Sequence, residues 1–396
     1  MTKHRYARTG LPLAVLATAG LVATGATAGA SPKAKIPTVG AKSFNSSFNV
    51  MTRLRPLTAM GKGKIGVLLP ETVTSARYVS FDAPYLRRAL LAAGMKASQF
   101  IITNAQGSDA TELTQAQSAI TKGATVLLMD PIDSGVGTSI ETYAKAHGVK
   151  VIDYDRITLG GKRNYYVSFN NVQVGRLIGL GMVSCLSAWH VAKPNILVMR
   201  GAPTDNNATL FAQGYDGVLA PYFRSGKYVK VGEPAGTWDP PTALTTFQQQ
   251  YTAHKNINAV VMPNDDNANA VISYLKTLGI PPRTFPTTGQ DATLTGLQNI
   301  LAGYQCGTVY KPIYLEAQAS VALALYLRAH VTPPKALVNG RTYDSVQHRY
   351  VASVLLTPLW VTTRNMAATV VKDRWVKKAQ LCAGSFASLC RAASIK

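Results

Sequence analysis

Acidic residues are scarce in this chain of 396 residues. There are 19 Asp and Glu against 41 Lys and Arg, so the formal charge is +22 at pH 7. Charged residues make up only 15% of the chain and apolar residues 47%, a globular balance that excludes wholesale disorder. The length predicts two domains of ordinary size. The basic excess makes nucleic-acid binding the first hypothesis to test.

Common enzyme motifs are missing as well. The chain contains no G-x-S-x-G, no H-E-x-x-H and no G-x-x-x-x-G-K-[ST]. Residues 1–63 show no helix-turn-helix pattern, which argues against a DNA-binding regulator. A pair of carboxylates such as Asp155 and Asp291 leaves a glycoside-processing enzyme as an alternative. We expect a protein that is not an enzyme.

Long apolar runs are confined to the start of the chain. A basic beginning around Arg5 precedes an apolar stretch over 11–23, and small residues follow up to Ala30. This layout is typical of a secretory signal peptide over 1–30, with a buried N-terminal helix as the alternative. We therefore expect an exported protein, periplasmic or extracellular and associated with the cell envelope. Without residues 1–30 the chain keeps 38 basic against 19 acidic residues, so the signal peptide does not explain the charge.

Cysteine is rare, with four residues, an even number that suits two disulfides in an exported protein. We expect Cys382 to pair with Cys390 across a short loop in a C-terminal tail, residues 382–396. Cys185 and Cys306 are then either bonded to each other or buried as thiols. A metal site is disfavoured, because there is no C-x-x-C spacing and no histidine lies beside a cysteine. We expect no metal and no cofactor.

Strand and helix patterns alternate from residue 64 onward. Short apolar runs such as KIGVLLP (64–70) and VKVIDYD (149–155) predict buried strands, with helices between them, and the alternation restarts at NILVMRG (195–201). Nearly continuous apolar strands predict an α/β fold of two lobes, each a doubly wound parallel sheet. Residues 31–63, rich in Ser, Thr, Lys, Gly and Pro, predict a tether.

Polar and aromatic residues follow the predicted strands. In open parallel sheets ligands bind beyond the carboxyl ends of the strands, so these residues are candidates for a binding site. For a single Asp or Asn, the alternative is a cap on the next helix. The candidate ligand-binding residues are Arg77, Tyr78, Asp155, Arg156, Asp205, Asn207, Trp238, Asn264, Asp291 and Lys311.

These residue types suit a neutral polyol. Carboxylates accept hydrogen bonds from sugar hydroxyls, Arg and Lys donate to them, and amides do both. Aromatic faces pack on the apolar C–H faces of a pyranose ring. The pattern at the strand ends therefore predicts a monosaccharide site.

Several segments carry a family resemblance. From about residue 64 to residue 373, the chain resembles the xylose-type sugar-binding proteins of ABC importers, in the type I periplasmic binding protein superfamily. The segments are YDR (154–156), GAPTDNNATLF (201–211), TWDP (237–240), ND (264–265), GQDATLTG (289–296), TVYKP (308–312) and LLTP (355–358).

The resemblance implies how the chain is divided. A hinge of three crossovers joins two lobes that close over a ligand between them. The N-terminal lobe would comprise 64–167 plus 311–335, and the C-terminal lobe 168–310 plus 350–381.

The resemblance also assigns roles to residues. It places the family's sugar contacts on the ten candidates above, with Tyr78 and Trp238 on the two sides of the ring. Tyr78 stands where the family has Trp. The implied function is reversible capture of an aldopentose or aldohexose and its delivery to an ABC permease.

The implied protein is a monomer with no nucleic-acid partner. An exported sensor that presents its sugar to a membrane receptor kinase is the alternative. A neutral sugar does not account for the basic charge, so we expect electrostatic association with an anionic envelope surface.

Overall fold

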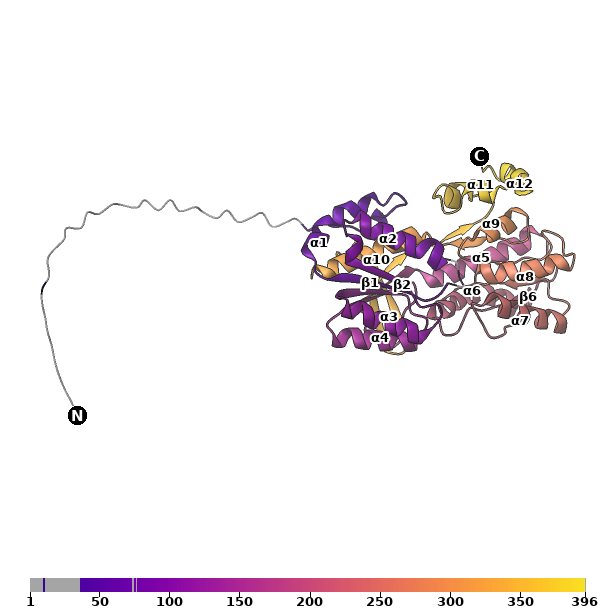
Figure 1. Ribbon diagram of the computed structural model, residues 1–396. Helices are drawn as coiled ribbons and strands as arrows, with labels where there is room; N and C mark the ends of the chain where they lie inside the picture. The colour runs from indigo at the N-terminus through magenta and orange to yellow at the C-terminus, as the bar shows by residue number, and fades with distance from the viewer. Residues whose placement is uncertain (1–9, 11–35, 73–74, 76, 396) are drawn as a thin grey trace. The chain divides into compact units, whose positions relative to one another are not determined.

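The larger of two parallel sheets has seven strands. The computed structural model describes residues 10, 36–72, 75 and 77–395 (Figure 1). The strand order is β10-β11-β5-β4-β3-β1-β2, and all neighbours are parallel except β10 and β11. The strands are β1 (Lys64–Leu69), β2 (Phe100–Asn104), β3 (Ala124–Met129), β4 (Lys150–Tyr154), β5 (Tyr165–Phe169), β10 (Gly340–Asp344) and β11 (Arg349–Leu356).

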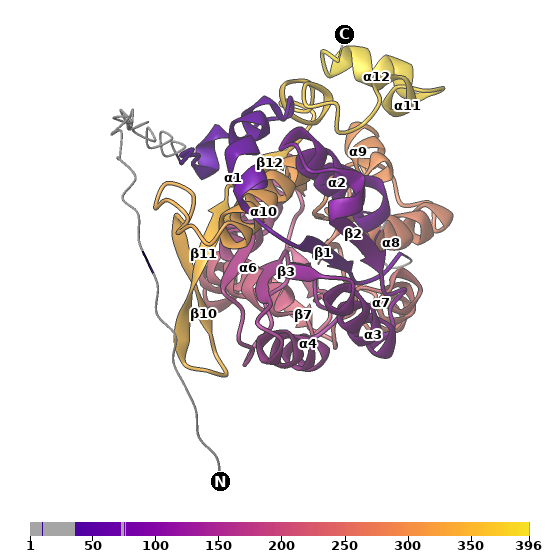
Figure 2. The same cartoon turned by 60° about the vertical axis from the view of Figure 1, so that its left-hand side comes forward.

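Helices cover both faces of this sheet. Figures 1 and 2 show α2 (Ala83–Ala92) and α10 (Ile313–Arg328) on one face, and α3 (Asp109–Thr121) and α4 (Ser134–Ala146) on the other. Successive strand residues point to opposite faces. Val67 therefore packs in the core beneath α2 and α10, whereas Leu68 packs against α3 and α4. Burial on both faces explains why the strands are continuous apolar runs.

The second sheet is smaller, with the parallel order β7-β6-β8. Isolated bridges at Val260–Thr287 and Gln290–Val309 continue it. β9 pairs antiparallel with β12. The strands are β6 (Asn195–Val198), β7 (Val229–Gly232), β8 (Ala259–Val261), β9 (Thr308–Tyr310) and β12 (Leu359–Val361).

Helices also cover both faces of the second sheet. Phe211 and Tyr215 of α6 pack with α5 against one face, and Phe247 of α7 packs with α8 against the other. The helices are α5 (Asn171–Ala188), α6 (Asn206–Arg224), α7 (Pro240–Ala253), α8 (Asp265–Thr277) and α9 (Leu294–Leu301).

The chain passes between the two sheets three times. The crossings follow β5, β9 and β11, which lead into α5, α10 and β12. The predicted fold class, two parallel-sheet lobes joined by three crossings, is therefore confirmed. One assignment is wrong: β11 lies in the first sheet, not in the second lobe as the range 350–381 implied. Val354 and Leu356 pair in parallel with Val167 and Phe169, and this pairing holds the segment in the first sheet.

The predicted tether over 31–63 is wrong for residues 36–63. This segment forms η1 (Ala41–Ser43), η2 (Asn49–Leu54) and α1 (Arg55–Met60), which pack onto the first lobe. Its apolar residues recur every three or four positions, as one face of a helix does, and composition alone conceals that periodicity. The side chains buried in the core are Phe44, Phe48, Met51, Leu54 and Leu57.

All four cysteines form disulfides. Cys382 bonds to Cys390, as expected, and Cys185 bonds to Cys306, which decides between the two alternatives. The C-terminal region contains η5 (Ala367–Val371), α11 (Lys378–Leu381) and α12 (Phe386–Ala392). None of the described helices has the length and apolar character needed to span a bilayer. The predicted signal peptide lies outside the described residues, apart from Gly10.

Candidate functional site

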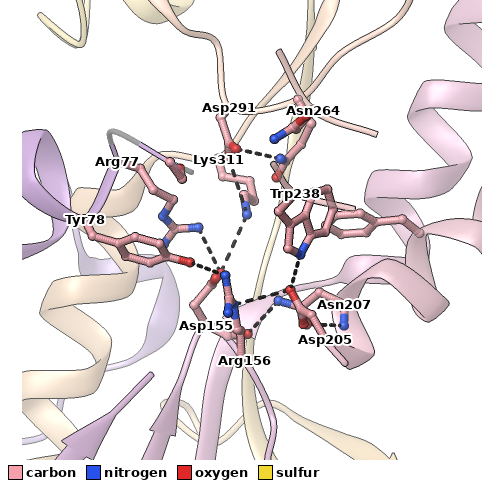
Figure 3. A pocket seen from close by; sticks show the side chains of 13 residues that line it. Arg77, Tyr78, Asp155, Arg156, Asp205, Asn207, Trp238, Asn264, Asp291 and Lys311 are labelled. Atoms are coloured by element: carbon pink, nitrogen blue, oxygen red, sulfur yellow. Dashed lines mark hydrogen bonds and ion pairs between the residues drawn. The ribbon is translucent and has the colours of Figure 1, made fainter. Parts of the chain in front are cut away.

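One cavity brings together all ten candidate residues (Figure 3). It encloses about 380 Å³ of space between atoms, a volume that includes its open mouth. Ser75, Phe211 and Gln290 complete its lining. The residues come from both lobes, at the carboxyl ends of their strands, as the parallel topology predicts.

Asp155 and Arg156 enter the cavity directly after β4. Asp155 has a left-handed backbone, with φ of 58°, and its amide donates to Val167 of β5. A non-glycine residue with positive φ is strained and persists only when its surroundings hold it. Asp155 is buried, and its carboxylate lies 3.0 Å from the Arg77 guanidinium.

Arg77 is held by carboxylates on three sides. It begins the turn that leads into η3 (Tyr78–Asp82), and its guanidinium donates to both carboxylate oxygens of Asp82. It also lies 3.3 Å from Glu316 of α10. Burial alone would lower the pKa of Arg77, but Asp155, Asp82 and Glu316 raise it well above its usual value. Arg77 therefore presents a fixed positive charge to the cavity.

Arg156 joins the two lobes. It donates to the hydroxyl of Tyr78 at 3.0 Å, and its Nε lies 3.3 Å from Asp205 of the second lobe. Behind it, the buried carboxylate of Asp130 lies 3.8 Å away. Burial lowers the pKa of Arg156, but Tyr78, Asp205 and Asp130 outweigh that effect and raise it. Arg156 is therefore charged and held in place by both lobes.

Two residues that the second lobe contributes to the cavity are also helix caps. Asp205 caps α6, accepting from the Asn207 amide at 2.8 Å, and its other oxygen accepts from the Trp238 indole at 3.1 Å. Asn264 caps α8. Asp205 and Asn264 therefore each cap a helix and also line the cavity.

Lys311 lies between carboxylates of the two lobes. It follows β9, and its ammonium is 3.6 Å from Asp155 and 3.5 Å from Asp291. Burial alone would raise the pKa of Asp155, but Arg77, Lys311 and Arg156 lower it to about 2. Asp155 is therefore ionised in the folded protein at neutral pH.

The charges of the lining balance. Three cations, Arg77, Arg156 and Lys311, face three carboxylates, Asp155, Asp205 and Asp291. Tyr78 and Trp238 lie on opposite sides of the cavity (Figure 3). Such a site offers charged donors and acceptors to hydroxyl groups and two aromatic faces to a ring, without a net charge of its own. It is suited to a small neutral polyol.

Several residues that shape the site are not among the ten candidates. Asp82 directly precedes α2 but makes no cap hydrogen bond, and it pairs with Arg77 instead. Glu316 is a charged residue in a helix of otherwise mostly apolar residues, which was a usable signal. Gln290 lies in the segment GQDATLTG and Phe211 in the segment GAPTDNNATLF, and both segments also contain candidate residues. Among the residues that the structure describes, no group of three or more His, Cys, Asp and Glu is arranged to hold a metal ion.

Comparison with known families and sequences gives matches over most of the chain. Residues 65–330 match the periplasmic binding protein domain. The D-xylose-binding periplasmic protein of Escherichia coli is 36% identical over 288 residues, which cover 72% of this chain and 83% of that protein. The multiple sugar-binding periplasmic receptor ChvE of Rhizobium radiobacter is 33% identical over 357 residues, 85% of this chain and 97% of its own.

Solved structures share the architecture. A solute-binding protein of a carbohydrate transporter from Chloroflexus aurantiacus, in complex with D-glucose, matches with a TM-score of 0.71 and 26% identity. The match covers 80% of this chain and 97% of that chain. The two-lobed fold around the cavity is therefore the fold of a protein solved with a monosaccharide.

Proposed function

Because the chain belongs to the periplasmic binding protein family, with xylose-type sugar-binding proteins among its relatives, we propose that it captures a monosaccharide in this cavity. The ligand is an aldopentose or aldohexose, and the loaded protein delivers it to an ABC importer. The observation that carries the proposal is the balanced lining of three cations and three carboxylates between two aromatic rings.

The names of the relatives support this ligand class. They include proteins that bind D-xylose and proteins that bind several sugars, and a structural relative was solved with D-glucose. Arg77, Arg156 and Lys311 donate to the sugar hydroxyls, and Asp155, Asp205 and Asp291 accept from them. Tyr78 and Trp238 pack on the two faces of the ring, while Asn207 and Asn264 complete the hydrogen bonding.

Capture is reversible and coupled to hinge closure. Residues from both lobes line the cavity, so opening the lobes separates Arg156 from Asp205 and admits the ligand. The protein acts outside the cytoplasm as a monomer, exported by a signal peptide over 1–30, and it performs no catalysis on the sugar.

Intrinsic tryptophan fluorescence tests this proposal. The full chain is titrated with a panel of pentoses and hexoses, and at least one sugar should change the emission in a saturable way, because Trp238 loses contact with water. Trp238→Phe should abolish the signal.

Trp189→Phe is the matched control. Trp189 lines a different groove, beside the Cys185–Cys306 disulfide, so its loss should leave the titration unchanged. A panel that changes neither the fluorescence nor the melting temperature would refute the proposal.

A further inference from the structure

The surface of the protein is more basic than its composition indicates. Eleven of the 19 acidic residues are buried, many of them around the cavity, so they contribute little charge to the surface. Asp109 is the one acidic residue classed as exposed, and the other seven that are not buried are half-buried. The excess of Lys and Arg over Asp and Glu is therefore greatest on the solvent-exposed surface.

One edge of the seven-stranded sheet carries a row of these cations. Each of the six mutually parallel strands has a Lys or Arg at its amino end, either as its first residue or two to four residues before it. In the spatial order of the strands from β11 to β2, this basic edge consists of Arg349, Lys162, Lys150, Lys122, Lys64 and Lys96.

The parallel topology aligns these residues. Amino ends of parallel strands meet at one edge, and neighbouring strands lie about 4.8 Å apart, so six strands give a row about 24 Å long. All six side chains are exposed except Lys64, which is half-buried. In the part of the chain that the structure describes, none of the six forms an ion pair.

A groove lies at one end of the row. Lys145 joins Lys150, Lys162 and Arg349 in its lining. The one carboxylate in that lining, Glu141, is buried and accepts a hydrogen bond from the Lys162 amide. Four exposed cations therefore line the groove with no exposed acidic residue among them.

The basic edge is separate from the sugar cavity. The cavity lies at the carboxyl ends of β1 and β4, and the basic edge lies at the amino ends of the same strands. A partner bound there leaves the cavity accessible.

We propose that the basic edge binds a linear polymer of phosphate groups. A row of cations that runs into a groove matches an extended chain better than a flat surface. Five of the six residues are lysines, which act as point charges and tolerate the variable geometry of a flexible polyphosphate backbone. The proposal goes beyond sugar capture and does not depend on it.

A four-residue variant tests this surface. In the full chain, Lys145→Gln, Lys150→Gln, Lys162→Gln and Arg349→Gln remove the cations of the groove. Binding of medium-chain inorganic polyphosphate is then measured over a range of salt concentrations. The affinity at low salt should fall by at least about tenfold, and the slope of log K against log salt should become shallower by about three.

A control variant removes the same charge elsewhere. Lys193, Arg224, Lys227 and Lys255 are exposed residues of the other lobe, and their replacement by Gln should leave polyphosphate binding close to that of the unchanged protein. Sugar titrations should be the same for both variants, which separates this test from that of the proposed function.

Two outcomes would overturn the proposal: no polyphosphate binding, with or without binding to phosphatidylglycerol vesicles, and equal losses in the two variants. The first outcome is divided further by a parallel measurement with phosphatidylglycerol vesicles, which the protein either binds or does not bind. Binding to the vesicles alone would assign the basic edge to a membrane surface.

Discussion

Trp238 reaches its place in the cavity because Gly201 has no side chain. A Cβ at position 201 would lie 2.2 Å from the indole ring, closer than any real contact allows. The indole also donates to Asp205, so its position fixes one of the candidate sugar acceptors. The precise placement of the ring therefore depends on a glycine that lines no part of the cavity.

Gly201→Ala should weaken sugar binding by about tenfold or more, because the methyl group displaces Trp238 from the ring of the ligand. Calorimetric titration of the full chain measures the change. Gly217→Ala is the matched control, since a Cβ there meets no atom within 4 Å and affinity should be unchanged. Equal affinities for the two variants would contradict this role of Gly201.

Glu112 is a buried carboxylic acid on α3, in the first lobe. Its Oε2 accepts from the Ile132 amide at 3.0 Å, and burial raises its pKa from 4.5 to about 8. The folded state therefore keeps a proton that the unfolded state loses above about pH 4.5. Between about pH 5 and pH 8, this difference lowers the free energy of unfolding as the pH rises, by up to about 1.4 kcal/mol per unit.

Glu112→Gln should remove that part of the pH dependence. The variant keeps the acceptor for Ile132 and has no proton to lose, so its stability relative to the unchanged protein should increase from pH 5 to pH 8. Denaturant unfolding at each pH measures the difference. Parallel profiles for the two proteins would show that Glu112 is ionised in the fold.

Most of the ten candidate residues could be predicted because they follow short apolar segments at the ends of strands. Lys311 after TVY and Asp155 after VKVIDY are examples. The residues that hold them were harder to find, because Asp82 and Glu316 lie on helices and meet Arg77 only in three dimensions. A strand pattern defines where a site lies, whereas the partners of its charges depend on how helices pack against the sheet.

At the scale of elements, the two disulfides close loops of very different length. Cys185–Cys306 spans 121 residues and joins α5 to the segment that leads into β9 and Lys311, and Cys382–Cys390 spans 8 residues in the C-terminal region. In the chain-entropy account, a crosslink stabilises the fold by restricting the unfolded chain, and a longer loop is restricted more.

Replacing Cys185 and Cys306 by Ser should therefore cost more stability than replacing Cys382 and Cys390. The expected losses are about 5 and about 2.5 kcal/mol in the free energy of unfolding. Denaturant unfolding of the two double variants measures them. Equal losses, or a larger loss for the C-terminal pair, would contradict the prediction.

Long, regular helices and strands could be predicted from the sequence. Short strands, and pairings between strands far apart in the chain, could not. The restart of the strand–helix alternation at residue 195 matches β6 and the second sheet. β11 could not be placed, because its parallel partner β5 is almost 200 residues earlier and nothing local encodes that pairing. Residues 36–63 appeared to be a tether because polar and small residues separate the buried apolar ones.

Across the whole molecule, the charges are sorted by position. Most carboxylates are buried. Three carboxylates, two of them buried, line the cavity opposite three cations, and exposed cations lie at the other end of the first sheet. Acidic residues are therefore scarce on the surface, whereas the lining of the proposed sugar site has equal numbers of cations and carboxylates. A basic protein can in this way bind a neutral ligand.

Calorimetric titration of the full chain with single pentoses and hexoses tests the central claim most directly. We predict saturable binding of at least one of them at one site per chain. Arg156→Ala should weaken it by about 100-fold, or about 2.7 kcal/mol, because Asp205 and the sugar each lose a charged donor. Absence of heat with every sugar, or full affinity in the Arg156→Ala variant, would contradict the account.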